Sequence, residues 1–133
     1  MPTDFAALFT AARLAEMFPP SRTNDFFDAL YGDAEDGAYD IRLTFREATA
    51  KQLVFAFELH QRKGKCLACN LTYGLPQVFT RHPVINIKGV ISSIASSLYP
   101  AASATPELSW RLGATEEHSR QLHSIPLLVS LPA

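Results

Sequence analysis

The sequence has no excess of either charge, few cysteines and no long hydrophobic run. Its 133 residues include 12 Lys and Arg against 13 Asp and Glu, a net charge of −1, and 2 cysteines. The balanced charge excludes a bulk nucleic-acid binder, which normally carries a clear basic excess. The hydrophobic content of 47% excludes an intrinsically disordered chain. Every apolar run is far shorter than the ~20 residues of a membrane span, so we predict no transmembrane helix.

The N-terminal segment and the two cysteines predict a cytoplasmic location. The chain does not open with a basic segment followed by an unbroken apolar stretch, which argues against a secretory signal. Two cysteines make no disulfide framework and suit a reducing compartment in which thiols stay free. A chain of this length buries enough surface for one core without disulfides or metal. We therefore expect a single domain over residues 1–133.

The first part of the chain, residues 1–37, is predicted to be a helical acidic leader. Residues 3–18 are rich in alanine, contain no glycine or proline, and precede Pro19 and Pro20, which predicts one helix. A second, short helix is expected over 25–31, ended by Gly32. The leader carries 2 Lys and Arg against 7 Asp and Glu, a net charge of −5.

The second part, residues 38–133, is predicted to be a sheet region with one amphipathic helix near 84–98. Apolar residues alternate with polar ones over 39–46 and 53–60 and again over 67–73, with a hairpin turn at 62–65, which predicts three consecutive antiparallel strands. Two further strands are expected near 108–112 and 121–131. The element order ααβββαββ predicts an α+β, two-layer sandwich, in which a single antiparallel sheet of about five strands has helices packed on one face.

This element order is similar to that of the small dimeric secretion chaperones. Those proteins run α, βββ, α, ββ and usually finish with another helix. The sequence departs from that pattern because no helix follows the last predicted strand, which ends near residue 131.

The most specific motif is a single CxxC formed by Cys66 and Cys69. A zinc finger needs a second pair of ligands, and a c-type haem site needs a histidine where Asn70 stands. Within an alternating strand the two sulfur atoms should point to opposite faces, which opposes both chelation and a disulfide. We expect structural cysteines and no cofactor. A metal-binding or thiol redox protein, assisted by His60 and His82, stays open as an alternative.

No motif indicates an enzyme, so we assign no catalytic residue. The sequence contains no HExxH, GxSxG or glycine-rich phosphate loop. Anion binding is a second alternative, since residues 38–88 carry 8 Lys and Arg against 3 Asp and Glu. The aromatic residues fall on the core side of the strands, which disfavours stacking on nucleic-acid bases. The candidate anion-binding residues are those of the basic hairpin and of the segment before the later helix: Arg62, Lys63, Lys65, Arg81 and His82.

Protein binding has the strongest physical motivation. The helix predicted over 3–18 is apolar on two sides, and uncharged apolar surfaces are typical of subunit contacts. We expect a homodimer, with Phe9, Leu14 and Phe18 as interface candidates, unless the chain's own sheet buries these side chains. The function predicted from the sequence is a non-enzymatic interaction module, chaperone-like or adaptor-like, that presents a surface to a protein partner.

Overall fold

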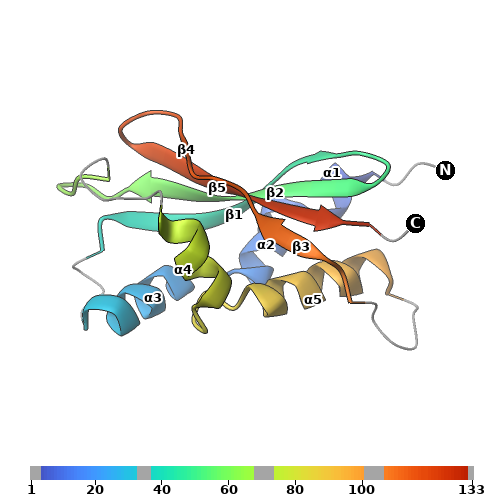
Figure 1. Ribbon diagram of the computed structural model, residues 1–133, viewed down its shortest axis with the longest axis horizontal. Helices are drawn as coiled ribbons and strands as arrows, with labels where there is room; N and C mark the ends of the chain where they lie inside the picture. The colour runs from blue at the N-terminus through green and yellow to red at the C-terminus, as the bar shows by residue number, and fades with distance from the viewer. Residues whose placement is uncertain (1–3, 33–36, 68–73, 101–106, 132–133) are drawn as a thin grey trace.

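The computed structural model of the chain describes residues 4–32, 37–67, 74–100 and 107–131 (Figure 1). In these residues the leader forms three helices, and a helical pair separates the first two strands from the last three. The elements in chain order are α1 (Phe5–Leu8), α2 (Ala11–Met17), α3 (Ser21–Tyr31), β1 (Tyr39–Ala48), β2 (Gln52–Gln61), α4 (Leu75–Arg81), α5 (Ile87–Leu98), β3 (Trp110–Leu112), β4 (Glu116–Glu117) and β5 (Leu122–Ser130).

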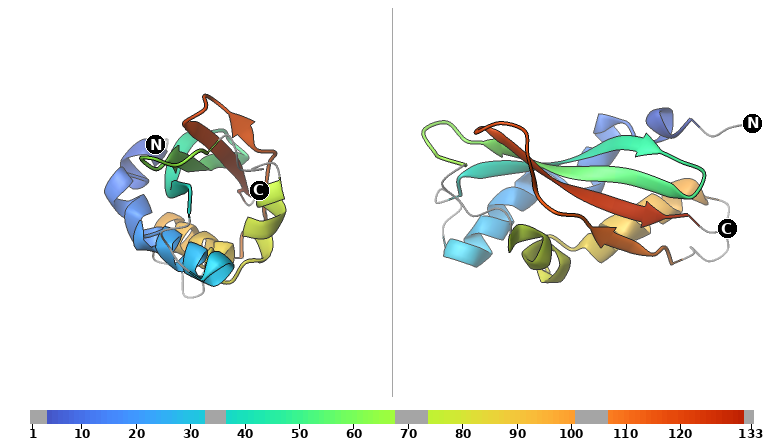
Figure 2. Two further views of the ribbon diagram at one scale, coloured as in Figure 1. Left: turned by 90° about the vertical axis from the view of Figure 1, so that its left-hand side faces the viewer. Right: turned by 45° about the horizontal axis from the view of Figure 1, so that its top comes forward.

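The strands form one antiparallel sheet of five strands, in the order β1-β2-β5-β3, with β4 paired to β5. Viewed end-on, the sheet curves over the helices, with α1 and α2 at one side and α4 at the other (Figure 2). The predicted α+β class with a single antiparallel sheet is therefore confirmed. In this order β1 is an edge strand, and α2 packs beside it.

The N-terminal helix differs from the sequence prediction because it is divided in two. Thr10 begins α2 as its N-cap, and its hydroxyl oxygen accepts a hydrogen bond from the Arg13 backbone nitrogen at 3.3 Å. Asp4 caps α1 in the same way, at 3.1 Å from the nitrogen of Ala7. The chain leaves the helical conformation at Phe9, whose side chain is buried in the core. A capping side chain and a buried anchor thus outweigh the helix propensity of the alanines.

Two later segments also differ from the prediction. Helix α4, for which no helix was predicted, begins directly after Gly74, and Pro76 lies in its first turn, where no backbone N–H is needed. Helix α5 begins after Asn86, and the Asn86 side chain accepts a hydrogen bond from the Gly89 nitrogen at 3.3 Å. The strand expected over 67–73 lies outside the described residues except for Leu67, which is in a bend.

The core lies between the inner face of the sheet and the helices, and aromatic rings dominate it. The inner residues of β2, among them Phe55 and Phe57, are fully buried. Phe9 meets Phe55 edge-on with ring centroids 5.1 Å apart, and Phe18 meets Phe57 at 5.3 Å. Phe79 of α4 contacts Phe57 from the other side at 5.8 Å. These ring contacts attach the leader and α4 to the same strand.

The Phe57→Ala substitution should lower the free energy of unfolding by about 3–5 kcal/mol, because it leaves a cavity where helices from both halves meet β2. Val54 lies on the opposite face of the same strand and is half-buried. Val54→Ala is therefore the matched control, with an expected loss of about 1 kcal/mol. Urea denaturation measures both values. Similar losses for the two variants would contradict this account of the core.

Candidate functional site

The metal and redox candidates are not gathered into a site in the described part of the chain. Cys66 is exposed just after the hairpin turn and is disulfide-bonded, so the expectation of a free thiol in a strand is wrong for this residue. Cys69 lies outside the described residues. The His60 ring is 3.0 Å from the Glu58 carboxylate, whereas the Nδ1 atom of His82 accepts a hydrogen bond from the Val84 nitrogen. Among the described residues, no group of three His, Cys, Asp or Glu could hold a metal ion.

Arg62 has contacts within its own chain that account for its position. Its guanidinium donates to Asp40 at 3.1 Å and to Asn24 at 2.7 Å, and it lies over the Phe27 ring at 5.3 Å. Only 18% of its side chain is exposed. Arg62 therefore links the sheet to the leader, and its guanidinium has little capacity left for an external anion.

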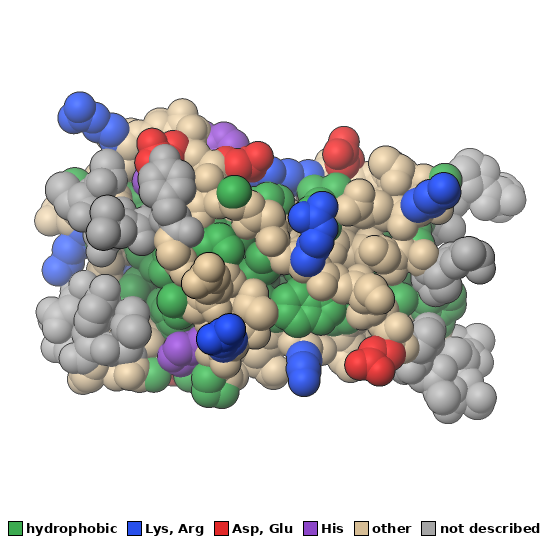
Figure 3. Space-filling view, viewed as in Figure 1, with side chains coloured by type: hydrophobic (Ala, Val, Ile, Leu, Met, Phe, Trp, Pro, Cys, Tyr) green, Lys and Arg blue, Asp and Glu red, His purple; other side chains and the backbone are tan. Residues whose placement is uncertain are grey.

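The other anion candidates are more exposed but are distributed over two elements. Lys63 and Lys65 lie in the turn after β2, and Arg81 lies in the last turn of α4, followed by His82. The His82 ring packs edge-on against Phe26 at 4.8 Å, so this histidine is part of the packing beneath the sheet. On the face shown in Figure 3, basic side chains are scattered over the surface, and some acidic ones lie among them. The anion-binding alternative stays a prediction.

The three predicted interface residues lie in the core of a single chain. Phe9, Leu14 and Phe18 are 3%, 2% and 2% exposed, and the two phenylalanines contact the inner face of β2. A protein partner would therefore have to use other residues for as long as the chain stays folded in this way. The homodimer itself stays a prediction.

A polar cluster that the sequence reasoning missed lies on the outer face of the sheet. A register shift between Phe45 and Glu47 marks a bulge at Arg46, and bulges commonly re-aim a side chain. The Arg46 guanidinium donates to Glu116 at 2.7 Å and to the Ser124 hydroxyl at 2.5 Å. Nε2 of His118 is 2.7 Å from the same hydroxyl. The cluster thus ties β4 and β5 to the distant edge strand β1.

This cluster brings together serine, histidine and glutamate, yet its geometry does not match nucleophilic catalysis. In a catalytic triad the acid holds the histidine through the ring nitrogen that does not face the serine. Here the Glu116 carboxylate is 3.9 Å from Nε2 of His118, the same atom that contacts Ser124. Ser124 is also fully buried, so its hydroxyl cannot reach a substrate. The geometry of the cluster therefore fits a structural contact that joins β1, β4 and β5.

The change of stability between neutral and acidic pH should depend in part on Glu116. The hydrogen bond from Arg46 lowers the pKa of the Glu116 carboxyl below its ordinary value of 4.5. A carboxyl group whose pKa is lowered on folding stabilises the fold at pH values above its ordinary pKa. This stabilisation is lost as the pH falls through the lowered pKa. At neutral pH the free energy of unfolding of wild type should exceed that of Glu116→Gln by less than about 1 kcal/mol, since about half of the Glu116 side chain is exposed. In acid this difference should vanish.

Thermal denaturation between neutral and acidic pH measures this difference. Glu107→Gln is the control, because Glu107 is exposed and lies outside the cluster. A difference between wild type and Glu116→Gln that persists unchanged in acid would refute the assignment of Arg46 and Glu116 as an ion pair in solution.

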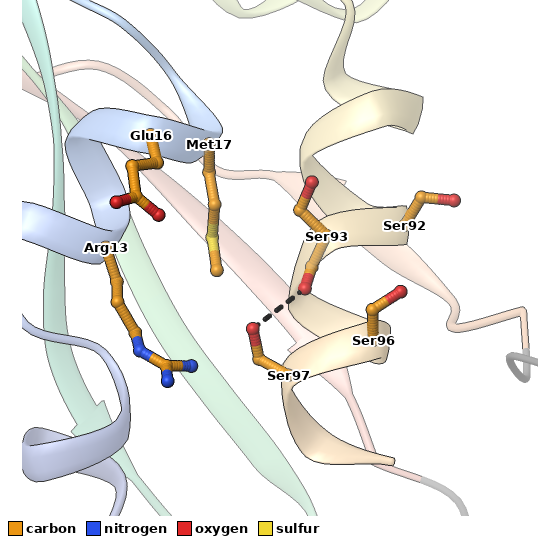
Figure 4. Close-up of a pocket in the computed structure, with 7 residues that line it drawn as sticks. All are labelled: Arg13, Glu16, Met17, Ser92, Ser93, Ser96 and Ser97. Atoms are coloured by element: carbon orange, nitrogen blue, oxygen red, sulfur yellow. Dashed lines mark hydrogen bonds between the residues drawn. The ribbon is translucent and has the colours of Figure 1, made fainter. Parts of the chain in front are cut away.

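A first hollow lies between α2 and α5 (Figure 4). It has a volume of about 520 Å³, and Arg13, Glu16 and Met17 of α2 face four serines of α5 across it. The Ser97 hydroxyl donates to the Ser93 carbonyl at 3.0 Å, which satisfies it within its own helix. The hollow is open and polar, with no polar side chain buried in it and aimed at a ligand.

A second hollow, which we call the edge groove, lies between α2 and the edge strand β1. It has a volume of about 390 Å³ and is more apolar than the first. Ala11 and Ala15 are one helical turn apart on an exposed side of α2, and they line it together with Phe18 and Pro20. The opposite wall consists of residues 40–44 of β1, with Glu58 behind them.

The backbone of β1 presents hydrogen-bonding groups toward the edge groove. The Arg62 nitrogen donates to the Ala38 carbonyl, so even-numbered residues of β1 pair with β2 and odd-numbered residues point to the free edge. At Ile41 this edge is occupied, since the buried Thr23 hydroxyl lies 3.0 Å from the Ile41 nitrogen and 3.4 Å from its oxygen. At Leu43, among the described contacts, neither backbone group has a partner. Within the groove, the part of the edge without a hydrogen-bond partner therefore begins after Ile41, where the contact with Thr23 ends.

Amide hydrogen exchange should show this alternation along β1. We expect the Leu43 amide to exchange on the order of a hundredfold faster than those of Arg42 and Thr44, which are bonded to β2. In Thr23→Val the Ile41 amide should also become fast, and the fold should lose about 1–3 kcal/mol because a buried N–H loses its acceptor. Thr23→Ser keeps a hydroxyl and should retain slow exchange. Slow exchange at Leu43 in wild type would show that this edge is closed.

Comparison with known proteins gives no relative: no family model, no curated protein and no solved structure matches the chain. In the described part, no helix has both the length and the apolar character needed to cross a membrane. A function for this chain therefore has to be argued from its own residues.

Proposed function

We propose that this chain is a non-enzymatic protein-binding module, chaperone-like or adaptor-like, which takes up an extended segment of a partner protein in the edge groove. The observation that supports this most directly is that the backbone groups of Leu43, whose residue as a whole is only 6% exposed, have no hydrogen-bond partner among the described contacts and lie beside the alanines of α2. Extended peptides commonly bind by adding a strand to an exposed sheet edge, where main-chain hydrogen bonds give affinity.

The groove favours a single extended chain over a folded partner. The wall formed by α2 lies beside the edge strand, and the space of about 390 Å³ is lined by Ala11 and Ala15, whose side chains take up little room. A second copy approaching edge to edge about a two-fold axis would bring its own α2 toward the same place. An isolated strand needs only about 5 Å beside its neighbour in the sheet.

Protection of the edge explains only part of this arrangement. Edge strands are commonly covered by helices or interrupted by bulges so that they do not aggregate. The chain uses such devices at Ile41, which Thr23 caps, and at Arg46, which lies in the bulge. Between them, among the described contacts, the backbone of Leu43 keeps no partner at this edge, where the adjoining helix surface includes the small apolar residues Ala11 and Ala15.

Selection from a random peptide library displayed on phage tests the proposal. Wild type should enrich sequences in which apolar and polar residues alternate, and Ala15→Trp should reduce binding at least about tenfold because indole fills the groove. Ala12→Trp is the matched control, since Ala12 is exposed on α2 but does not line the groove.

A selected peptide should also slow exchange of the Leu43 amide by occupying its edge. The proposal fails if the library yields no enriched peptide, or if enriched peptides bind Ala15→Trp as well as they bind wild type. Near-ultraviolet circular dichroism of each variant confirms that the fold is retained.

A further inference from the structure

The charges that line the edge groove differ in whether they already have a partner. Asp40 lies 3.1 Å from Arg62, and Glu58 lies 3.0 Å from the His60 ring. Arg42 is exposed in the groove wall, opposite Glu58 in the β1–β2 register, and among the described contacts its guanidinium makes no hydrogen bond or ion pair. The facing helix side contributes alanines, Phe18 and Pro20, none of which is charged.

The geometry of an added strand assigns a place to each of its side chains. In an added antiparallel strand, the residue opposite Leu43 would exchange two backbone hydrogen bonds with it. Its side chain would point inward, toward Ala11, Ala15 and Phe18. The neighbouring residues would point outward, beside Arg42 on one side and Thr44 on the other. Inward positions thus meet an apolar wall, and one outward position meets an unpaired guanidinium.

On the basis of the proposed function, we infer that the segment bound in the edge groove is acidic: it places a carboxylate against Arg42 and an apolar residue next to it in sequence, against the alanines of α2. A guanidinium and a carboxylate form charge-assisted hydrogen bonds that are stronger than neutral ones. Arg42 is then the residue that determines specificity, whereas Leu43 supplies affinity through its backbone.

Three blocked synthetic hexapeptides test this inference. The first has the sequence Thr-Val-Asp-Val-Thr-Val, and the other two carry asparagine or lysine in place of the aspartate. By isothermal titration, the aspartate peptide should bind wild type about three- to tenfold more tightly than the asparagine peptide, and the lysine peptide should bind most weakly. Raising the salt concentration should reduce these differences.

Variants of the chain identify the source of the preference. Arg42→Gln should remove the difference between the aspartate and asparagine peptides, and Arg42→Glu should reverse the order of the aspartate and lysine peptides. Arg111→Glu makes the same charge change at an exposed residue of β3, at the far side of the sheet, and should leave the order unchanged. Both substitutions are at exposed positions, where effects on stability are small.

The outcomes separate this inference from the proposed function. Equal affinity for the aspartate and asparagine peptides, in a chain that still binds them and loses them in Ala15→Trp, overturns the acidic preference alone. A preference that persists in Arg42→Gln overturns the role of Arg42. Absence of binding for all three peptides and for the whole library overturns both proposals together.

Discussion

The arrangement of the helices depends on the ring contacts made by two phenylalanines of β2. Phe55 and Phe57 are fully buried on the inner face of the central part of the sheet. Phe9 meets the first of them, and Phe18 and Phe79 meet the second. Edge-to-face ring pairs add specific geometry to the burial of large apolar surfaces. Because the leader and α4 reach the sheet through these rings, one strand determines where both lie.

The edge groove follows from this anchoring. Phe18 and Leu14 hold α2 against the sheet, and Ala11 and Ala15, on the adjoining part of the helix surface, then line the space beside the edge of β1. Larger residues at these two positions would fill the space, and the alanines leave it open. Thr23 at the start of α3 then closes one end by bonding to Ile41. The packing of the core and the shape of the binding surface are therefore consequences of the same contacts.

Local patterns predicted much of the fold, and the limits of that prediction have physical causes. Alternation identified the strands around 39–46 and 53–60, and apolar spacing identified the helix that runs over Ile87–Leu98. The apolar rows of the leader were detected, but a sequence does not state which surface buries them, so Phe9 was assigned to an interface and lies in the core. The groove was missed because it requires knowing that β1 is an edge strand, which depends on pairing between distant residues.

The contacts that stabilise the fold and the contact proposed to recognise a peptide depend differently on charge. The leader is acidic and the sheet region basic, yet the contacts that join them include ring pairs and the stacking of Arg62 on Phe27. Burial of apolar rings is little affected by salt, whereas an exposed guanidinium is screened within about 10 Å at moderate ionic strength. The edge groove should therefore keep its shape in salt while the contribution of Arg42 declines. Raising the salt concentration should therefore weaken the preference for a carboxylate without weakening the backbone hydrogen bonds, because only the carboxylate preference depends on an exposed charge.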